Sequence, residues 1–252
     1  MYDDDDLSVL DIEAELESPL DSIEPIDEES EAHKPDPEAM LRLLTAPEKQ
    51  QQMLAARAFC EIQDERAIPH LIRMLKDVCP LVRVSAAYAL GRNPSTTAVE
   101  PLIDQFHSDW NGYVRKGVVW ALGNCRDRRA LSLLTDALKT DISAVRLWAA
   151  SSLAQMSYLA YEDIVASIPP LITALRQDPV AAVRSNCAWS IGQLCRELPS
   201  NAIYGGAIDG LIEAFAEDED VGVQEDAKAA LLRVGDPRGI QMIEAIELEG
   251  LL

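Results

Sequence analysis

The fold of this chain is decided by the stretch VRVSAAYALG, which runs from Val82 to Gly91. Variants of it follow along the chain: VRKGVVWALG from Val114, VRLWAASSLA from Val145, VRSNCAWSIG from Val183, and a degraded copy that begins Val223-Gln224. The copies are separated by 32, 31, 38 and 40 residues. One step of 31 residues back from Val82 reaches Gln51, where QQMLAARAFC keeps the small residues. Periods of roughly 30 to 45 residues with helical spacing are typical of solenoids built from stacked helix pairs.

This periodicity predicts an all-α fold, a right-handed α-solenoid of about six helix pairs plus a C-terminal capping helix. The solenoid is expected over residues 35–246, with repeats at 35–63, 64–94, 95–126, 127–158, 159–201 and 202–235, and with a cap over 236–252. Within each inner helix, positions +4, +7 and +8 from the valine should be core, as for Ala86, Ala89 and Leu90.

Glycines and aspartates mark the expected helix ends. Gly91, Gly123 and Gly192 stand where an inner helix should close in left-handed geometry. Asp64, Asp127 and Asp236 stand where the next outer helix needs an N-cap. Two connections, residues 157–167 and 196–206, hold roughly six to nine residues more than the repeat needs, and insertions in solenoids become loops on one edge. Such loops are either functional or merely tolerated, because added loop length costs little.

The negative charge is concentrated at the N-terminus. The net charge is −21, and residues 1–34 hold 14 Asp or Glu against one Lys. This balance argues against nucleic-acid and anionic-membrane partners, because no basic patch is available to neutralise phosphates. Residues 1–34 are expected to be a disordered solubilising tail. The alternative is a docking segment, with Val9, Ile12 and Leu16 on one helical face, that contacts the partner or competes for the concave face.

The sequence shows no sign of membrane insertion or secretion. No apolar run reaches the roughly 18 residues that a spanning helix needs, and Met1-Tyr2-Asp3 is unlike a basic signal-peptide start. A cytoplasmic protein is expected, with peripheral attachment to a thylakoid surface through a partner as the alternative. The five cysteines form no CxxC pair and are expected to be reduced structural thiols; they are Cys60, Cys79, Cys125, Cys187 and Cys195.

An acid precedes each repeated arginine by five or six residues. The predicted pairs are Asp77 with Arg83, Asp109 with Arg115, Asp141 with Arg146, and Asp178 with Arg184. In the last repeat, Gln224 has replaced the basic member. We interpret these pairs as a structural ladder of charge-assisted hydrogen bonds that ties each inter-helix turn to the following inner helix.

Aromatic residues recur on the side of the inner helices opposite the predicted core. Counted from each valine, position +6 holds Arg57, Tyr88, Trp120, Ser151, Trp189 and Ala229, which we call the +6 row. Position +2 holds Met53, Val84, Lys116, Leu147, Ser185 and Glu225. The predicted binding residues on the concave face are Arg57, Tyr88, Lys116, Trp120 and Trp189, because exposed aromatics in line suit a binding surface. Alternatively, Tyr88 and Trp120 shield the neighbouring helix.

No catalytic or metal-binding pattern is present, so no catalytic residue and no metal ligand is predicted. The histidines His33, His70 and His107 are scattered, and none has a Cys, His or acid at metal-ligand spacing. Nothing resembles a catalytic triad, a phosphate-cradling glycine loop or a nucleophile elbow. The chain is therefore expected not to be an enzyme.

The stretches AIPHLIRMLKDVCPLVRVSAAYALG, from Ala67, and ALSLLTDALKTDISAVRLWAASSLA, from Ala130, resemble HEAT-like repeats of the phycobilisome-lyase type. The resemblance covers roughly residues 35–246. It implies a protein-recognition scaffold or assembly chaperone that needs no cofactor and whose partner is a phycobiliprotein or another photosynthetic-complex subunit. The alternative it implies is a bilin lyase subunit that attaches or detaches a tetrapyrrole such as phycocyanobilin.

Overall fold

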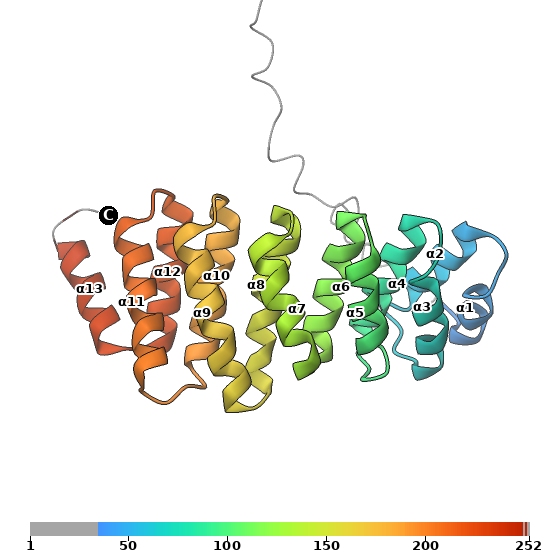
Figure 1. Cartoon of the computed structure of the whole chain (residues 1–252), viewed down its shortest axis with the longest axis horizontal. Helices are drawn as coiled ribbons and strands as arrows, with labels where there is room; N and C mark the ends of the chain where they lie inside the picture. Colours follow the sequence, from blue (N-terminus) through green and yellow to red (C-terminus); the bar gives the residue numbers. More distant parts are fainter. Residues whose placement is uncertain (1–34, 249, 251–252) are drawn as a thin grey trace, which may run out of the picture. The chain divides into compact units, whose positions relative to one another are not determined.

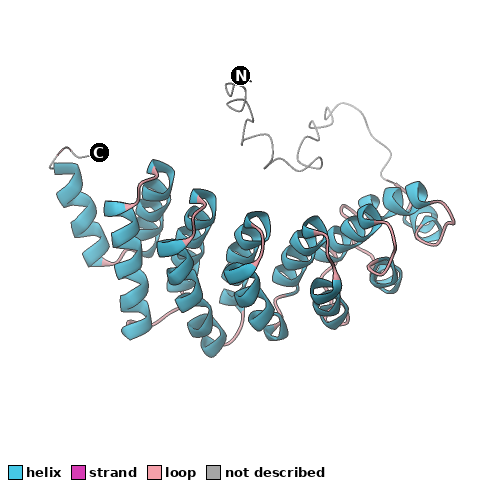
Figure 2. Cartoon of the chain, turned by 45° about the horizontal axis from the view of Figure 1, so that its top comes forward, coloured by secondary structure: helices cyan, strands magenta, loops and turns pink. Residues whose placement is uncertain are grey.

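The computed structural model describes residues 35–248 and residue 250, which form thirteen α-helices with short connections and no strand (Figures 1 and 2). The helices are α1 (Pro37–Leu43), α2 (Lys49–Ala58), α3 (Ile68–Met74), α4 (Pro80–Arg92), α5 (Val99–Ser108), α6 (Gly112–Cys125), α7 (Leu131–Thr140), α8 (Ser143–Ala154), α9 (Tyr161–Gln177), α10 (Ala181–Cys195), α11 (Ala202–Glu217), α12 (Val221–Val234) and α13 (Pro237–Leu248). The predictions made for residues 1–34 lie outside the described residues.

Within the described residues the helices stack in two layers (Figure 1). The even-numbered helices α2 to α12 form the inner layer, the odd-numbered helices α1 to α11 form the outer layer, and α13 packs on α11 and α12. Successive inner helices pack more closely on one another than successive outer helices do, so the inner layer lies on the concave side of the stack. The predicted α-solenoid of six helix pairs and a capping helix is confirmed.

The core lies between the layers and follows the predicted spacing. Val82, Ala86, Ala89 and Leu90 of α4 are fully buried, and the equivalent residues of α6 are buried in the same way. Each outer helix from α3 to α11 contributes at least one fully buried leucine, such as Leu71, Leu102, Leu134, Leu171 and Leu211. Because every repeat buries the same set of positions, the core continues from one repeat to the next.

The glycines of the inner helices do not end those helices, and that expectation is wrong. Gly91, Gly123 and Gly192 lie within α4, α6 and α10, and none has a positive φ. They are places of close approach instead. A Cβ on Gly123 would lie 2.6 Å from Oγ of Ser152 in α8, and a Cβ on Gly192 would lie 2.8 Å from Cβ of Ala230 in α12. A side chain at these positions would push the inner helices apart.

The predicted N-caps are present, and each belongs to a larger network. Asp64, Asp127 and Asp236 accept backbone N–H bonds from residues two further on, at 2.9 to 3.0 Å. These residues are arginines, and each reaches an acid of the preceding outer helix. The resulting bridges are Arg66 to Glu38, Arg129 to Glu100 and Arg238 to Asp209. The motif Asp-x-Arg therefore links outer helices that contact each other little.

The two longer connections are not simple loops, because most of their extra residues lengthen the following outer helix. Outer helices α9 and α11 have 17 and 16 residues, whereas α5 and α7 have 10 each. The short helix η4 (Gln155–Tyr158) precedes α9, and Asn201 caps α11 by accepting from the Tyr204 amide at 2.9 Å. Among the residues that the structure describes, no helix combines the length and apolarity needed to cross a bilayer.

Candidate functional site

The inner layer contains a groove with a cavity of about 580 Å³ that spans four successive repeats. Three half-buried tryptophans border it, Trp120 from α6, Trp148 from α8 and Trp189 from α10. The other lining residues are Gly123, Asn124, Ser151, Ser152, Gln155, Ala182, Ser185, Asn186 and Asp226. Three tryptophans around one cavity, in a chain with four in total, make this groove the strongest candidate site.

Trp120 occupies the centre of an aromatic series on the concave face. Its ring lies on Gly91 of the preceding inner helix, because a Cβ on Gly91 would be 2.6 Å from Cε3 of Trp120. The Trp120 ring centroid is 5.3 Å from that of Tyr88 and 6.5 Å from that of Trp148, and the Trp148 contact is edge-to-face. These separations lie within the range of favourable aromatic pairs. Trp120 is therefore held in place by the preceding and the following repeat.

Two cations cover faces of these rings. The guanidinium of Arg92 lies 5.7 Å from the Trp120 centroid, and the ammonium of Lys116 lies 5.5 Å from the Trp148 centroid. Lys116 is only 7% exposed, so its predicted place on an open binding face is wrong. Its position +2 is turned toward the neighbouring repeat, where the Trp148 ring replaces water around the ammonium.

The groove face is rotated from the predicted one. The lining residues stand mainly at positions +3, +6 and +10 of the repeated stretch: Trp148, Asn186 and Asp226 at +3, Trp120, Ser151 and Trp189 at +6, and Asn124 and Gln155 at +10. On a helix, +3 and +10 lie about 60° and about 40° to one side of +6, whereas +2 lies on the other side. The prediction missed Trp148 for this reason, although a tryptophan at a position beside the +6 row on the helix was a usable signal.

The rest of the +6 row extends on both sides of the cavity. Arg57 is exposed on α2 and Tyr88 is half-buried on α4, and neither lines the cavity. Ser151 donates to Oδ1 of Asn186 at 3.0 Å, which links α8 to α10 at the cavity wall. Trp120 and Trp189 thus share one cavity, whereas Arg57 and Tyr88 lie on the same layer toward its N-terminal end. Binding by the row remains a prediction.

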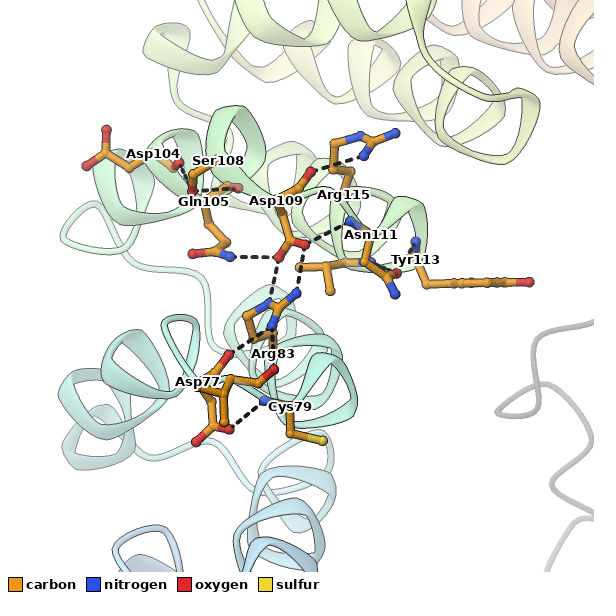
Figure 3. A network of polar contacts seen from close by, with 12 residues as sticks. Asp77, Cys79, Arg83, Asp104, Gln105, Ser108, Asp109, Asn111, Tyr113 and Arg115 are labelled. Carbon is orange, nitrogen blue, oxygen red and sulfur yellow. Dashed lines mark hydrogen bonds and ion pairs between the residues drawn. The ribbon is translucent and has the colours of Figure 1, made fainter.

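The arginine ladder joins consecutive repeats, which corrects the predicted partners (Figure 3). Arg83 donates from Nη1 to the backbone oxygen of Asp77 at 2.9 Å, but its Nε and Nη2 donate to the carboxylate of Asp109 in the next repeat, at 2.7 and 2.8 Å. The same forward pairing recurs as Arg115 to Asp141, Arg146 to Asp178 and Arg184 to Asp218. The prediction missed this arrangement because each arginine contacts two aspartates. It binds the backbone oxygen of the preceding one and the carboxylate of the following one, and the repeat spacing does not show which contact is which.

Both ends of the ladder carry glutamine. Gln224 donates from Nε2 to the backbone oxygen of Asp218 at 2.7 Å, and Gln52 donates to that of Ala46 at 2.7 Å. Each glutamine therefore makes the same bond to a backbone oxygen of its own repeat that the arginines make, but its side chain is neutral. At the first repeat, Lys49 supplies the cation for Asp77. Gln224 thus stands in the last helix pair, where no aspartate of a following repeat is available to bind an arginine.

Three aspartates of the ladder, Asp77, Asp109 and Asp218, are held in their charged form. Burial alone would raise the pKa of Asp109, but hydrogen bonds from Arg83, the Asn111 amide and Gln105 outweigh it, so this pKa lies below its usual range. The same balance lowers the pKa of Asp77, with Lys49 as the main donor, and of Asp218, with Arg184 as the main donor. Charged hydrogen bonds of this kind stabilise the folded state.

Comparison with known proteins agrees with this architecture. The family model for HEAT repeats matches residues 37–118 and 99–190, more than half of the chain. A search of curated proteins finds no match. A designed armadillo repeat protein in complex with the peptide (KR)4 has a TM-score of 0.61 at 22% identity, covering 79% of this chain and 98% of that chain. Yeast importin-beta has a TM-score of 0.59 at 17% identity, and the match covers 84% of this chain but 32% of that one. Similarity at these identities shows the fold alone.

Proposed function

The chain belongs to the HEAT-repeat proteins, and we propose that it is a protein-recognition scaffold or assembly chaperone that binds a segment of a partner in its concave groove. The observation that carries this proposal is the cavity shared by Trp120, Trp148 and Trp189 on three consecutive inner helices. Aromatic side chains in a concave, partly desolvated position are the residues that most often dominate binding energy in protein interfaces.

The polar lining of the groove supports a peptide as the bound group. Asn124 and Gln155 line the cavity, and among the described residues neither side-chain amide has a hydrogen-bond partner. A side-chain amide can donate to a backbone carbonyl and accept from a backbone N–H. An extended segment crossing α6 and α8 would thus find both apolar contact surface and backbone hydrogen bonds. The designed armadillo protein with the same helix arrangement is in complex with a peptide, which supports the same use of the fold.

Selection from a peptide library tests the proposal. Peptides selected on the full chain should lose about tenfold or more in affinity toward Trp148→Ala and Trp189→Ala, because truncation removes the aromatic contact surface. Leu232→Ser, which changes an exposed apolar side chain outside the groove, is the matched control and should bind as the unaltered chain does. Selected peptides that bind all variants equally would contradict the proposal.

The partner's identity is a finer proposal that rests on the resemblance to the phycobilisome-lyase type. We infer a phycobiliprotein or another photosynthetic-complex subunit as the partner. The second candidate function is a bilin lyase subunit, which the three tryptophans favour because a conjugated tetrapyrrole can stack on their rings. Mixing the protein with phycocyanobilin distinguishes the two. A red-shifted absorbance that is lost in Trp120→Ala and Trp189→Ala supports the lyase, whereas an unchanged spectrum supports the scaffold.

A further inference from the structure

The turns that lead from outer to inner helices expose large apolar side chains on three consecutive repeats. The residues are Val78, Leu81, Trp110, Tyr113 and Ile142, with exposed fractions of 89, 63, 78, 60 and 50%. We call them the turn-edge strip. None of them lines the concave groove. The strip is continuous between the last two of these repeats, because Ile142 lies against Gly112 in the turn that also carries Trp110 and Tyr113. Contiguous exposed apolar residues of this kind mark interaction sites.

The ladder fixes the turns that carry the strip. In the turn before α6, Asp109 accepts from the Asn111 amide at 2.9 Å while it holds Arg83, and Asn111 accepts from the Tyr113 amide at 2.9 Å (Figure 3). Asp77 and Asp141 accept backbone N–H bonds in the neighbouring turns in the same way. A surface that is already ordered loses little conformational entropy when a partner binds.

A buried hydrogen-bond acceptor without a partner among the described residues lies beside the strip. Gln105 is 5% exposed, and its Nε2 donates to Asp109 at 2.7 Å, which fixes the orientation of the amide. Its Oε1 has no hydrogen-bond partner among the described residues. Gln105 lines a cavity of about 230 Å³ together with Lys76 and Trp110. A buried acceptor at the wall of a cavity requires a donor, and a ligand N–H can supply it.

Positive charges flank the strip. Lys76 and Lys139 are exposed at the ends of the outer helices that lead into these turns, and within residues 35–248 neither has an ion-pair partner. This charge disfavours pairing of the strip with the same strip of a second copy, because the lysines of both copies would meet. The charge complements a partner segment that carries carboxylates next to its apolar side chains.

We propose that the turn-edge strip is a second docking surface, which binds an acidic amphipathic segment of a partner protein. Apolar side chains of the segment cover Trp110 and Tyr113, its carboxylates pair with Lys76 and Lys139, and one N–H donates to Oε1 of Gln105. This surface is separate from the groove, so the chain can hold two partner segments at once.

A synthetic peptide tests the surface on the full chain. The probe is a fluorescein-labelled peptide of about 16 residues with leucine at every third or fourth position and glutamate between. Trp110→Ser with Tyr113→Ser, or Lys76→Glu with Lys139→Glu, should each weaken its binding about tenfold. All four positions are exposed, so the fold is retained, and circular dichroism checks this. Trp189→Ala should bind the probe unchanged, which keeps this test independent of the groove.

Three results would overturn the proposal. The first is equal binding of a peptide with serine in place of leucine, or lysine in place of glutamate. The second is absence of binding to the unaltered chain, or unchanged binding to both double variants. The third is a dimer, detected by light scattering, that dissociates in Trp110→Ser with Tyr113→Ser, since the occupant would then be a second copy.

Discussion

Arg83 and Asp109 belong to consecutive repeats, and their side chains form a two-bond pair that is almost entirely shielded from water. The Arg83 side chain is 8% exposed, and that of Asp109 is fully buried. Removal of one partner leaves the other as a buried, uncompensated charge.

We expect Asp109→Ala to lower the free energy of unfolding by about 3–5 kcal/mol, as is typical when one member of a buried pair is removed. The matched control is Glu213→Ala, which breaks an exposed inter-repeat pair with Arg176 and should cost about 1 kcal/mol or less. Urea unfolding followed by circular dichroism measures both. Similar losses in the two variants would show that the ladder contributes no more than a surface pair.

Acid should weaken the ladder. The pKa values of Asp77, Asp109 and Asp218 are lowered in the folded state, so their contribution is complete above the unfolded-state pKa of about 3.9 and is lost as the pH falls through the folded values. Urea midpoints should therefore change little down to about pH 4 and decrease steeply as the pH falls further. The Asp109→Asn variant should have a lower urea midpoint at neutral pH, and that midpoint should decrease less as the pH falls. A parallel decrease in both proteins would contradict the assignment.

Two glycines within helices should respond to alanine in opposite directions. In Gly123→Ala the new methyl group would meet Ser152 at 2.6 to 3.0 Å, and overpacking of this kind costs about 1–3 kcal/mol. Gly205 in α11 has open space around it, so Gly205→Ala should be neutral or stabilising by up to about 1 kcal/mol. Thermal unfolding compares the two. A stabilising Gly123→Ala would show that the inner helices can separate without cost.

The buried thiols should report local opening. Burial raises the pKa of Cys187, which is fully buried, and raises that of Cys195 to about 12. Because the thiolate is the reactive form, both should be silent toward Ellman's reagent in the native protein and react once α10 unfolds. Mass spectrometry of the labelled peptides identifies the reacting cysteines. Rapid labelling of Cys187 in the absence of denaturant would contradict the packing of α10.

The fold could be predicted because every repeat places the same apolar positions on the same helical face. The site was harder to predict, since +3 lies about 60° from +6 and also about 60° from the core valine, so its exposure depends on how the repeats pack. Trp120 and Trp189, which border the cavity, were predicted from their spacing. Trp148 stands at position +3, and its ring covers the ammonium of Lys116. The carboxylate partner of Arg83 depends on how the next repeat docks, which the spacing within one repeat does not specify.

The forward direction of the arginine pairs has a consequence for synthesis of the chain. N-terminal repeats emerge from the ribosome first, so α4 is complete before Asp109 has been made, and Arg83 then has only the backbone of its own turn to bind. The same holds for Arg115, Arg146 and Arg184 in turn. During synthesis, the most recently made arginine of the ladder therefore lacks its carboxylate partner until the next repeat has been made. The series ends at Gln224, which is neutral and needs no such partner.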